Sequence, residues 1–268
     1  MVAGVRGRYD EAELITMTPG DLMAQRQVDA GEGWSWIARG WGLFTQSAAL
    51  WVVTALIFGI LYFILMLIPL IGSLAAAILG PALFGGLVYG AREVERGNAL
   101  EVAHLFQAFR EPGRAGPMLV LGLVPLVAAI LSGVLAMVIV GGAVGVGAAS
   151  GSEGAAAGMA AGGGLLVMLL TIAIGLVVGA LLLFAIPRVM FGLAAPGQAI
   201  AESVQATLAN IGAYLVFAIV YVLLSIVAAI PLGLGFLVLI PVMAGAVYAA
   251  HGAVFGNAGE AASQEPAD

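Results

Sequence analysis

Six long apolar segments constrain the fold of this chain more than any other feature. They cover residues 48–68, 71–91, 118–140, 165–184, 211–230 and 232–251, and the fourth can extend to Phe191. Within these limits the first five contain no Asp, Glu, Arg or Lys, and the sixth ends on His251. A transmembrane helix needs roughly 20 apolar residues. Lipid offers no partner for backbone polar groups and the alternation typical of barrel strands is missing, so we expect six transmembrane helices.

Composition excludes several classes of protein. Hydrophobic residues make up 62% of the 268 residues, charged residues only 9%, and the mean hydropathy is +1.12, which excludes a water-soluble globular domain. The net charge of -6 leaves no basic face for nucleic acid. There is no Cys and there are only two His, so disulfides and thiolate sites are excluded, and we expect no metal and no cofactor.

The basic residues predict the orientation of the helices. All nine are Arg, and they lie before the first segment, between the second and third, and at the end of the fourth. The connections inside the three helix pairs hold none. The positive-inside rule therefore places both termini in the cytoplasm. No apolar run follows the N-terminus, so we expect no cleavable signal peptide. Every basic residue is Arg, and Gly, Ala and Val are abundant, which is typical of a GC-rich bacterial genome, so we expect a bacterial inner membrane.

A short amphipathic stretch precedes each pair of apolar segments. The stretches begin at about Trp34, Asn98 and Gly197, and each places apolar side chains at helical spacing. We expect helices lying along the cytoplasmic surface of the membrane. Their apolar positions are Trp34, Ile37, Trp41 and Phe44 in the first, Val102, Leu105, Phe106 and Phe109 in the second, and Ile200, Val204, Leu208 and Ile211 in the third.

The second helix of each pair also carries a proline followed by a glycine. These are Pro81 with Gly85, Pro187 with Gly192, and Pro241 with Gly245, and we expect a helix kink at each proline. The fold class predicted is therefore an all-α membrane protein of three parallel repeats, each an interfacial helix followed by a helical hairpin. The alternative is that the Pro and Gly pattern arises by chance in a chain rich in these residues.

The remaining segments complete the predicted domain organisation. Residues 1–33 are polar and are predicted to form a disordered tail, residues 34–255 the membrane domain, and residues 256–268 an acidic disordered tail. Residues 141–164 are almost entirely Gly, Ala, Ser and Val, which predicts a flexible loop on the outer side. A phosphate-binding loop is not expected there, since no Lys-Ser/Thr follows.

Few residues could carry chemistry. Arg188 follows Pro187, and the favoured interpretation is an anchor that reaches the headgroups, the alternative being a contact with Glu202 or a lipid phosphate. His104 is expected to be solvated and His251 to cap a helix or lie at the interface. No catalytic motif is present, so we do not expect an enzyme. The candidate contacts with lipid or a partner are Trp34, Trp41, Phe106, Phe109 and Arg188.

Several short motifs resemble those of a known family. They are Gly33-Trp34-Ser35-Trp36-Ile37, Gly40-Trp41-Gly42-Leu43-Phe44, Ile68-Pro69-Leu70-Ile71-Gly72, His104 to Arg110 and Ile230 to Gly235. The chain resembles an uncharacterised family of six-helix proteobacterial inner-membrane proteins. That family is similar to the membrane domain fused to some glycerophosphodiester phosphodiesterases. The resemblance spans roughly residues 33–255, implies a six-helix fold, and implies no catalytic residue.

Three functional classes follow from these features. An accessory or structural protein that contacts lipid or a partner subunit fits the absence of charge inside the spans. A transporter or permease for an apolar or lipid-like substrate is the alternative, since it fits the repeats and the kinked helices. A membrane-embedded enzyme fits least well. The partners expected are membrane lipids and a partner subunit or further copies of the chain, with no nucleic acid.

Overall fold

The computed structural model describes residues 26–69, 71–149 and 153–256, and this part of the chain is helical without a strand. Six helical runs in it are long and apolar enough to cross a membrane. The protein is therefore a multi-pass membrane protein by the length and composition of its helices. The six runs are α3 (Ala48–Met66), α4 (Ile71–Glu95), α6 with α7 (Ala115–Leu121 and Leu123–Ala149), α8 with α9 (Glu153–Leu182 and Ala185–Met190), α11 (Ile211–Ala229) and α12 (Phe236–Phe255).

Helices α4 and α12 lie at the centre of the molecule, together with the end of the fourth run. Helices α4 and α12 contact each other, and both contact the short helix α9, whose six residues are all buried. Few side chains of α3, α7 and α11 are in contrast buried. Exposed apolar side chains on outer helices are what a lipid environment accommodates, because lipid tails are as apolar as the side chains themselves.

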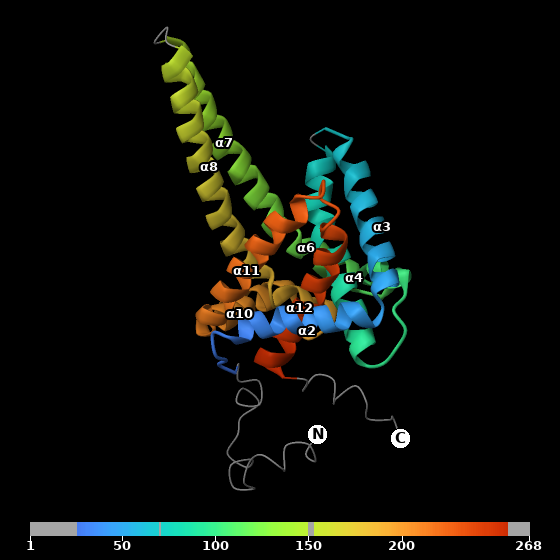
Figure 1. Ribbon diagram of the computed structural model, residues 1–268. Helices are drawn as coiled ribbons and strands as arrows, with labels where there is room; N and C mark the ends of the chain where they lie inside the picture. Colours follow the sequence, from blue (N-terminus) through green and yellow to red (C-terminus); the bar gives the residue numbers. More distant parts are fainter. Residues whose placement is uncertain (1–25, 70, 150–152, 257–268) are drawn as a thin grey trace, which may run out of the picture.

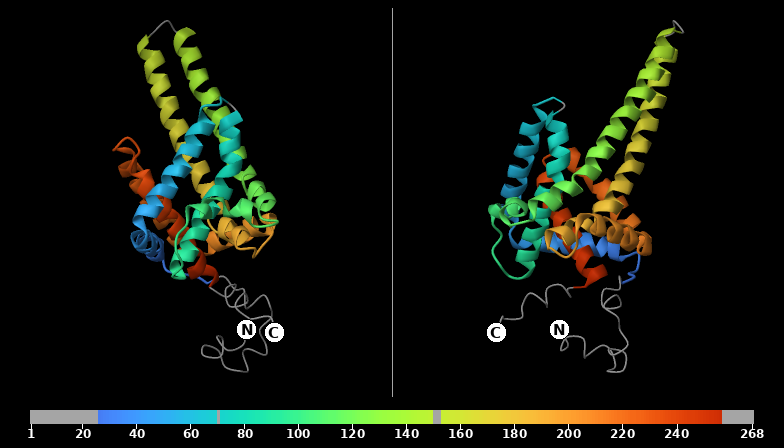
Figure 2. Two further views of the ribbon diagram at one scale, coloured as in Figure 1. Left: turned by 90° about the vertical axis from the view of Figure 1, so that its right-hand side faces the viewer. Right: turned by 180° about the vertical axis from the view of Figure 1, so that it is seen from behind.

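Three short segments form a layer across one end of the helices. They are α2 (Glu32–Gln46), the 3-10 helix η2 (Val102–Phe106) with α5 (Gln107–Arg110), and α10 (Pro196–Ala209). Figure 1 shows α2 and α10 lying across the base, with the three hairpins rising above them, and Figure 2 shows the same layer from two further sides. We call this the basal layer.

The second amphipathic stretch differs from the helix that we predicted. It consists of the five-residue η2 and the single turn α5 rather than one helix from Asn98. The backbone before it is extended at Glu101, and the backbone after it is extended at Glu111. Glu111 precedes Pro112, and a residue before proline is driven out of the helical region. The first and third stretches are helices as predicted, apart from their exact ends.

Each basal segment packs on a different hairpin. Helix α2 contacts α11 and α12, η2 contacts α3 and α4, and α10 contacts α8 and α9. The last two contacts join segments that are neighbours in the chain. The contact of α2 with α11 and α12 instead joins the first helix of the described chain to the last hairpin. Following these contacts and the chain, basal segments and hairpins therefore alternate.

The residues before α2 strengthen this contact, and part of the predicted N-terminal tail is therefore packed. The Arg26 N–H donates to the Val254 carbonyl at 2.8 Å. The Asn210 side chain accepts from the Val28 N–H at 2.7 Å and donates to the Arg26 carbonyl at 3.2 Å. Residues 26–33 thus belong to the membrane domain. Residues 1–25 and 257–268, for which tails were predicted, lie outside the described residues.

Residues 141–164 also differ from the prediction of a flexible loop. Helix α7 continues to Ala149 and α8 begins at Glu153, so only residues 150–152 fall outside the described helices. The two helices lie side by side, and a Cβ atom added at Gly163 would contact Ile139 and Ala143. Small side chains let two helices approach closely. Composition alone does not show that such a neighbouring helix is present. This hairpin extends furthest from the basal layer (Figure 1).

Close backbone contact holds α2 against its neighbours. A Cβ atom at Gly40 would lie 2.7 Å from the Ala246 nitrogen and would clash with the Val242 carbonyl oxygen, both in α12. Gly33 has the same relation to α11, where its Cβ would lie 2.8 Å from the Phe217 nitrogen. Glycine is required at both positions because backbone atoms of a neighbouring helix cannot move aside as a flexible side chain can.

We predict that Gly40→Ala destabilises the protein and that Gly42→Ala, in the same helix, does not. A Cβ at Gly42 has nothing within 4 Å, so alanine there improves helix propensity by about 0.5–1 kcal/mol. At Gly40 the clash outweighs that gain, and we expect a net loss of about 1–3 kcal/mol. Thermal unfolding of the purified variants in detergent measures both effects. Equal melting temperatures for the two variants would contradict the packing of α2 on α12.

Candidate functional site

A break in the fourth transmembrane run organises the polar part of the molecule. Helix α8 ends at Leu182 and α9 begins at Ala185, with Pro187 in the first turn of α9. The Ser203 hydroxyl of α10 accepts from the Phe184 N–H at 3.1 Å and donates to the Ala180 carbonyl at 2.8 Å. These two backbone groups would bond to each other in a continuous helix. The inserted hydroxyl therefore satisfies both groups where the helix opens.

Helices α4 and α12 behave differently at their prolines. Each continues through its proline, Pro81 in α4 and Pro241 in α12, and both prolines are buried. The Tyr62 hydroxyl of α3 donates to the Ala76 carbonyl of α4 at 3.2 Å, five residues before Pro81. Of the three predicted kink positions, only Pro187 lies next to an interruption in the helix.

The break places Arg188 inside the protein, which contradicts the favoured interpretation of a headgroup anchor. The Arg188 side chain is only 6% exposed and forms an ion pair with Glu202 of α10. Its guanidinium carbon lies 4.6 Å from the centre of the Phe255 ring at the end of α12. Glu202 also accepts from the Gln198 side chain at 2.8 Å. A charge taken out of water needs such partners, so Arg188 connects α9, α10 and α12.

Aromatic rings and a second arginine surround this ion pair. Arg92, at the end of α4, lies 4.4 Å from the Tyr89 ring centre and 4.5 Å from the Phe191 ring centre. His251 is buried inside α12 and stacks on Phe255 at 5.4 Å, so it neither caps the helix nor lies at the surface as we predicted. We call Arg92, Phe191, Arg188, His251 and Phe255 the basal cation–aromatic cluster. These contacts hold the ends of α4, α9 and α12 together.

His104 also departs from its predicted environment. It is half-buried, its ring packs edge-on to Tyr89 at 5.4 Å, and its Nδ1 atom accepts from the Glu101 N–H at 3.2 Å. Burial lowers the pKa of His104 below its usual value, and the nearby Glu101 and Glu93 oppose this only in part. The neutral ring can therefore accept the hydrogen bond that begins η2.

The predicted lipid or partner contacts divide into exposed and buried side chains. Trp34 and Trp41 of α2 are 58% and 52% exposed, and Phe109 of α5 is also exposed. Phe106 is half-buried and packs against the core. On α2, Ile37 and Phe44 are buried although the sequence placed them on one face with the two tryptophans. No sequence pattern singled out Trp36, which is fully buried between Phe184 and Phe217.

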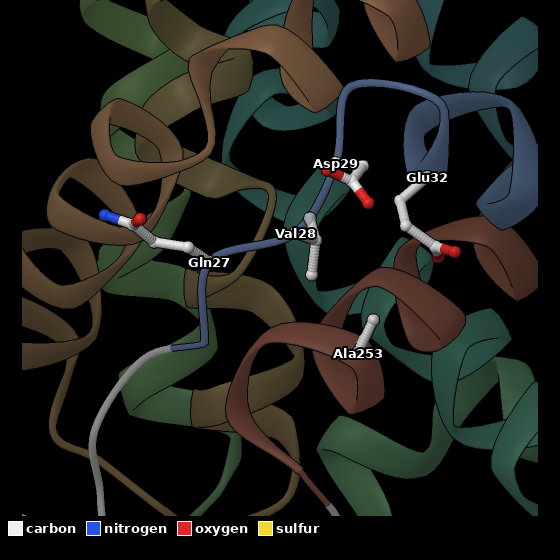
Figure 3. A pocket seen from close by; sticks show the side chains of 5 residues that line it. All are labelled: Gln27, Val28, Asp29, Glu32 and Ala253. Atoms are coloured by element: carbon white, nitrogen blue, oxygen red, sulfur yellow. The ribbon is translucent and has the colours of Figure 1, made fainter.

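A polar pocket lies beside the start of α2. It has a volume of about 520 Å³ and is lined by Gln27, Val28, Asp29, Glu32 and Ala253. Figure 3 shows the first three on the segment that leads into α2, Glu32 at the start of α2, and Ala253 on α12. Glu32 forms an ion pair with Arg39. No cluster of three or more His, Asp or Glu able to hold a metal occurs within residues 26–69, 71–149 and 153–256.

A second pocket is an apolar groove along α7 and α8. Its volume is about 730 Å³, and its lining side chains are all aliphatic. They come from α6, α7 and α8, and Ile200 of α10 also lines it. We call it the α7–α8 groove.

Comparison of the chain with models of protein families, with curated proteins and with solved structures finds no match. The family resemblance inferred from the sequence motifs therefore stays a prediction.

We predict that Arg188→Gln destabilises the protein far more than Arg39→Gln. The first variant leaves the half-buried Glu202 carboxylate without its ion-pair partner, and because Arg188 itself is buried we expect a cost of up to about 3–5 kcal/mol. The second breaks the exposed pair with Glu32, which contributes less than about 1 kcal/mol. Thermal unfolding in detergent measures the two losses. If Arg188→Met combined with Glu202→Met recovers no stability over Arg188→Gln, the assignment of a buried, mutually dependent pair is wrong.

Proposed function

We propose that the protein is an accessory or structural component of the bacterial inner membrane that acts on lipid or a partner subunit through its helix surfaces. The observation that carries this proposal is the basal layer. It presents Trp34, Trp41 and Phe109 outward at one end of six membrane-crossing helices. Tryptophan prefers the headgroup region of a membrane because its ring is apolar and its N–H is polar. The basal layer is then an anchor in one leaflet.

Charge supports placing the basal layer on the cytoplasmic side. The seven arginines of the described residues precede α3, lie in the last turn of α4, lie between α4 and α6, or lie in α9. These segments are all at the basal end. By the positive-inside rule this end faces the cytoplasm, which puts both chain termini there.

The alternating contacts of basal segments and hairpins support three parallel repeats. In the alignment of Ile37-Ala38-Arg39, Val102-Ala103-His104 and Ile200-Ala201-Glu202, the next residues are Gly40, Leu105 and Ser203. Each of the three meets the second helix of a hairpin. Gly40 approaches α12, the Leu105 carbonyl lies against Gly86 of α4, and Ser203 bonds to α8. The same register position thus contacts the second helix of a hairpin in all three units, although the contact itself differs from one unit to the next.

The accessory function predicts that Trp34 and Trp41 lie in the headgroup region. In liposomes containing lipids brominated near the headgroup, we expect strong quenching of tryptophan fluorescence, most of it lost in Trp34→Phe/Trp41→Phe. Trp36→Phe, which removes a buried ring, is the matched control and should leave the quenching largely intact.

Two results would contradict the proposal. One is quenching that the double variant leaves unchanged, since the basal layer would then lie outside the membrane surface. The other is saturable solute uptake into proteoliposomes that is driven by a proton or sodium gradient. Uptake of this kind would identify the protein as a transporter instead.

A further inference from the structure

We propose that the α7–α8 groove binds the acyl chains of an anionic phospholipid of the cytoplasmic leaflet, with its phosphate beside Arg110 and Arg114. The inference rests on the proposed membrane orientation and names the lipid class on which the protein acts. It does not depend on the anchoring of Trp34 and Trp41, which lie on another basal segment.

The shape and lining of the groove fit acyl chains. Its volume of about 730 Å³ lies within the range of small-molecule sites, and every side chain that lines it is aliphatic. It runs along α7 and α8, from Val120 and Leu181 near the basal layer to Leu135 and Leu170 further out. Ile200 of α10 borders the basal end. A chain lying in the groove therefore begins at the level of the headgroups on the basal side.

Positive charge lies at that same end. Arg114 directly precedes α6, and Val120 follows it by six residues, which is about 9 Å along a helix. The Arg114 guanidinium is held in place, since it donates to the Val189 carbonyl at 2.9 Å and to Glu111 at 2.6 Å. Its side chain is still 19% exposed. A fixed guanidinium with free surface is well suited to a phosphate oxygen.

Arg110 supplies the uncompensated charge. It is exposed, and within the described part of the chain no carboxylate lies within ion-pair distance of it. Glu111, the nearest acidic residue in sequence, is engaged by Arg114. The loop from α5 to α6 thus carries a net positive charge at the basal end of an aliphatic groove.

This combination favours a lipid over a helix of a second copy. An anionic phospholipid has apolar chains and a negative headgroup at one end, which match the groove and the arginines respectively. An apolar transmembrane helix would fill the groove but would provide no counter-charge for Arg110. Charge complementarity therefore favours an anionic lipid as the occupant of the groove.

Native mass spectrometry of the detergent-purified full chain tests the proposal. With added phosphatidylglycerol we expect one lipid to remain bound per chain, whereas phosphatidylcholine should bind more weakly. Ala128→Trp fills the groove and should abolish this binding. Ala129→Trp is the matched control, because Ala129 is exposed on the same helix and does not line the groove. Arg110→Gln should weaken binding about fivefold, the effect of one charge near a headgroup, and Arg39→Gln should not.

Each contrary result overturns a stated part of the proposal. Phosphatidylglycerol binding that survives Ala128→Trp would show that the lipid does not occupy the groove. Equal binding of phosphatidylcholine, with no effect of Arg110→Gln, would contradict the anionic headgroup. A dimer that dissociates on Ala128→Trp, without bound lipid, would assign the groove to a second copy of the chain. Quenching of Trp34 and Trp41 by brominated lipids is measured separately, so these failures leave the anchoring intact.

Discussion

The architecture depends on the close backbone approach of α2 to α11 and α12. Inside a membrane, apolar side chains gain little by leaving lipid for protein, so helices associate through dense packing and satisfied polar groups. Gly33 and Gly40 allow that packing, and the hydrogen bonds of Arg26 and Val28 to Val254 and Asn210 extend it. Helix α2 also touches α3 and α4, so this contact joins the last hairpin to the first one.

Polar groups in the basal layer complete the packing that the glycines allow. Ser203 satisfies the backbone where the fourth run opens, and the opening turns Arg188 toward Glu202 and Phe255. The ion pair then links α9 to α10, and the aromatic ring links both to α12. An unpaired charge at this depth would be costly, which explains why the break, the serine and the carboxylate occur together. The outer helices need no such partners, so their aliphatic side chains, including those of the α7–α8 groove, remain available to lipid.

Much of this fold could be predicted from the sequence. Long apolar runs indicate helices that cross the membrane, and amphipathic spacing indicates helices that lie along its surface. The six runs and the first and third basal helices were predicted on that ground. The environment of Arg188 could not be predicted, since it depends on a contact between α9 and α10 that no local pattern encodes. Trp36 and His251 were missed for the same reason: their burial follows from which helices meet. The helices that run into residues 141–164 were not predicted, because a glycine-rich composition favours a flexible loop and does not show that α7 and α8 lie side by side.

The central claim is that three basal segments and three hairpins form a closed ring joined by α2. A circular permutant tests it most directly, with the end of α12 linked to the segment before α2 and new termini opened at Gly97, between α4 and η2. The account predicts that this permutant inserts into membranes and melts close to the unpermuted chain, because every connection between units lies at the basal end. A permutant opened after Pro69, inside the α3–α4 hairpin, should not fold. If the Gly97 permutant also fails to fold, or if both permutants fold equally well, the ring is contradicted.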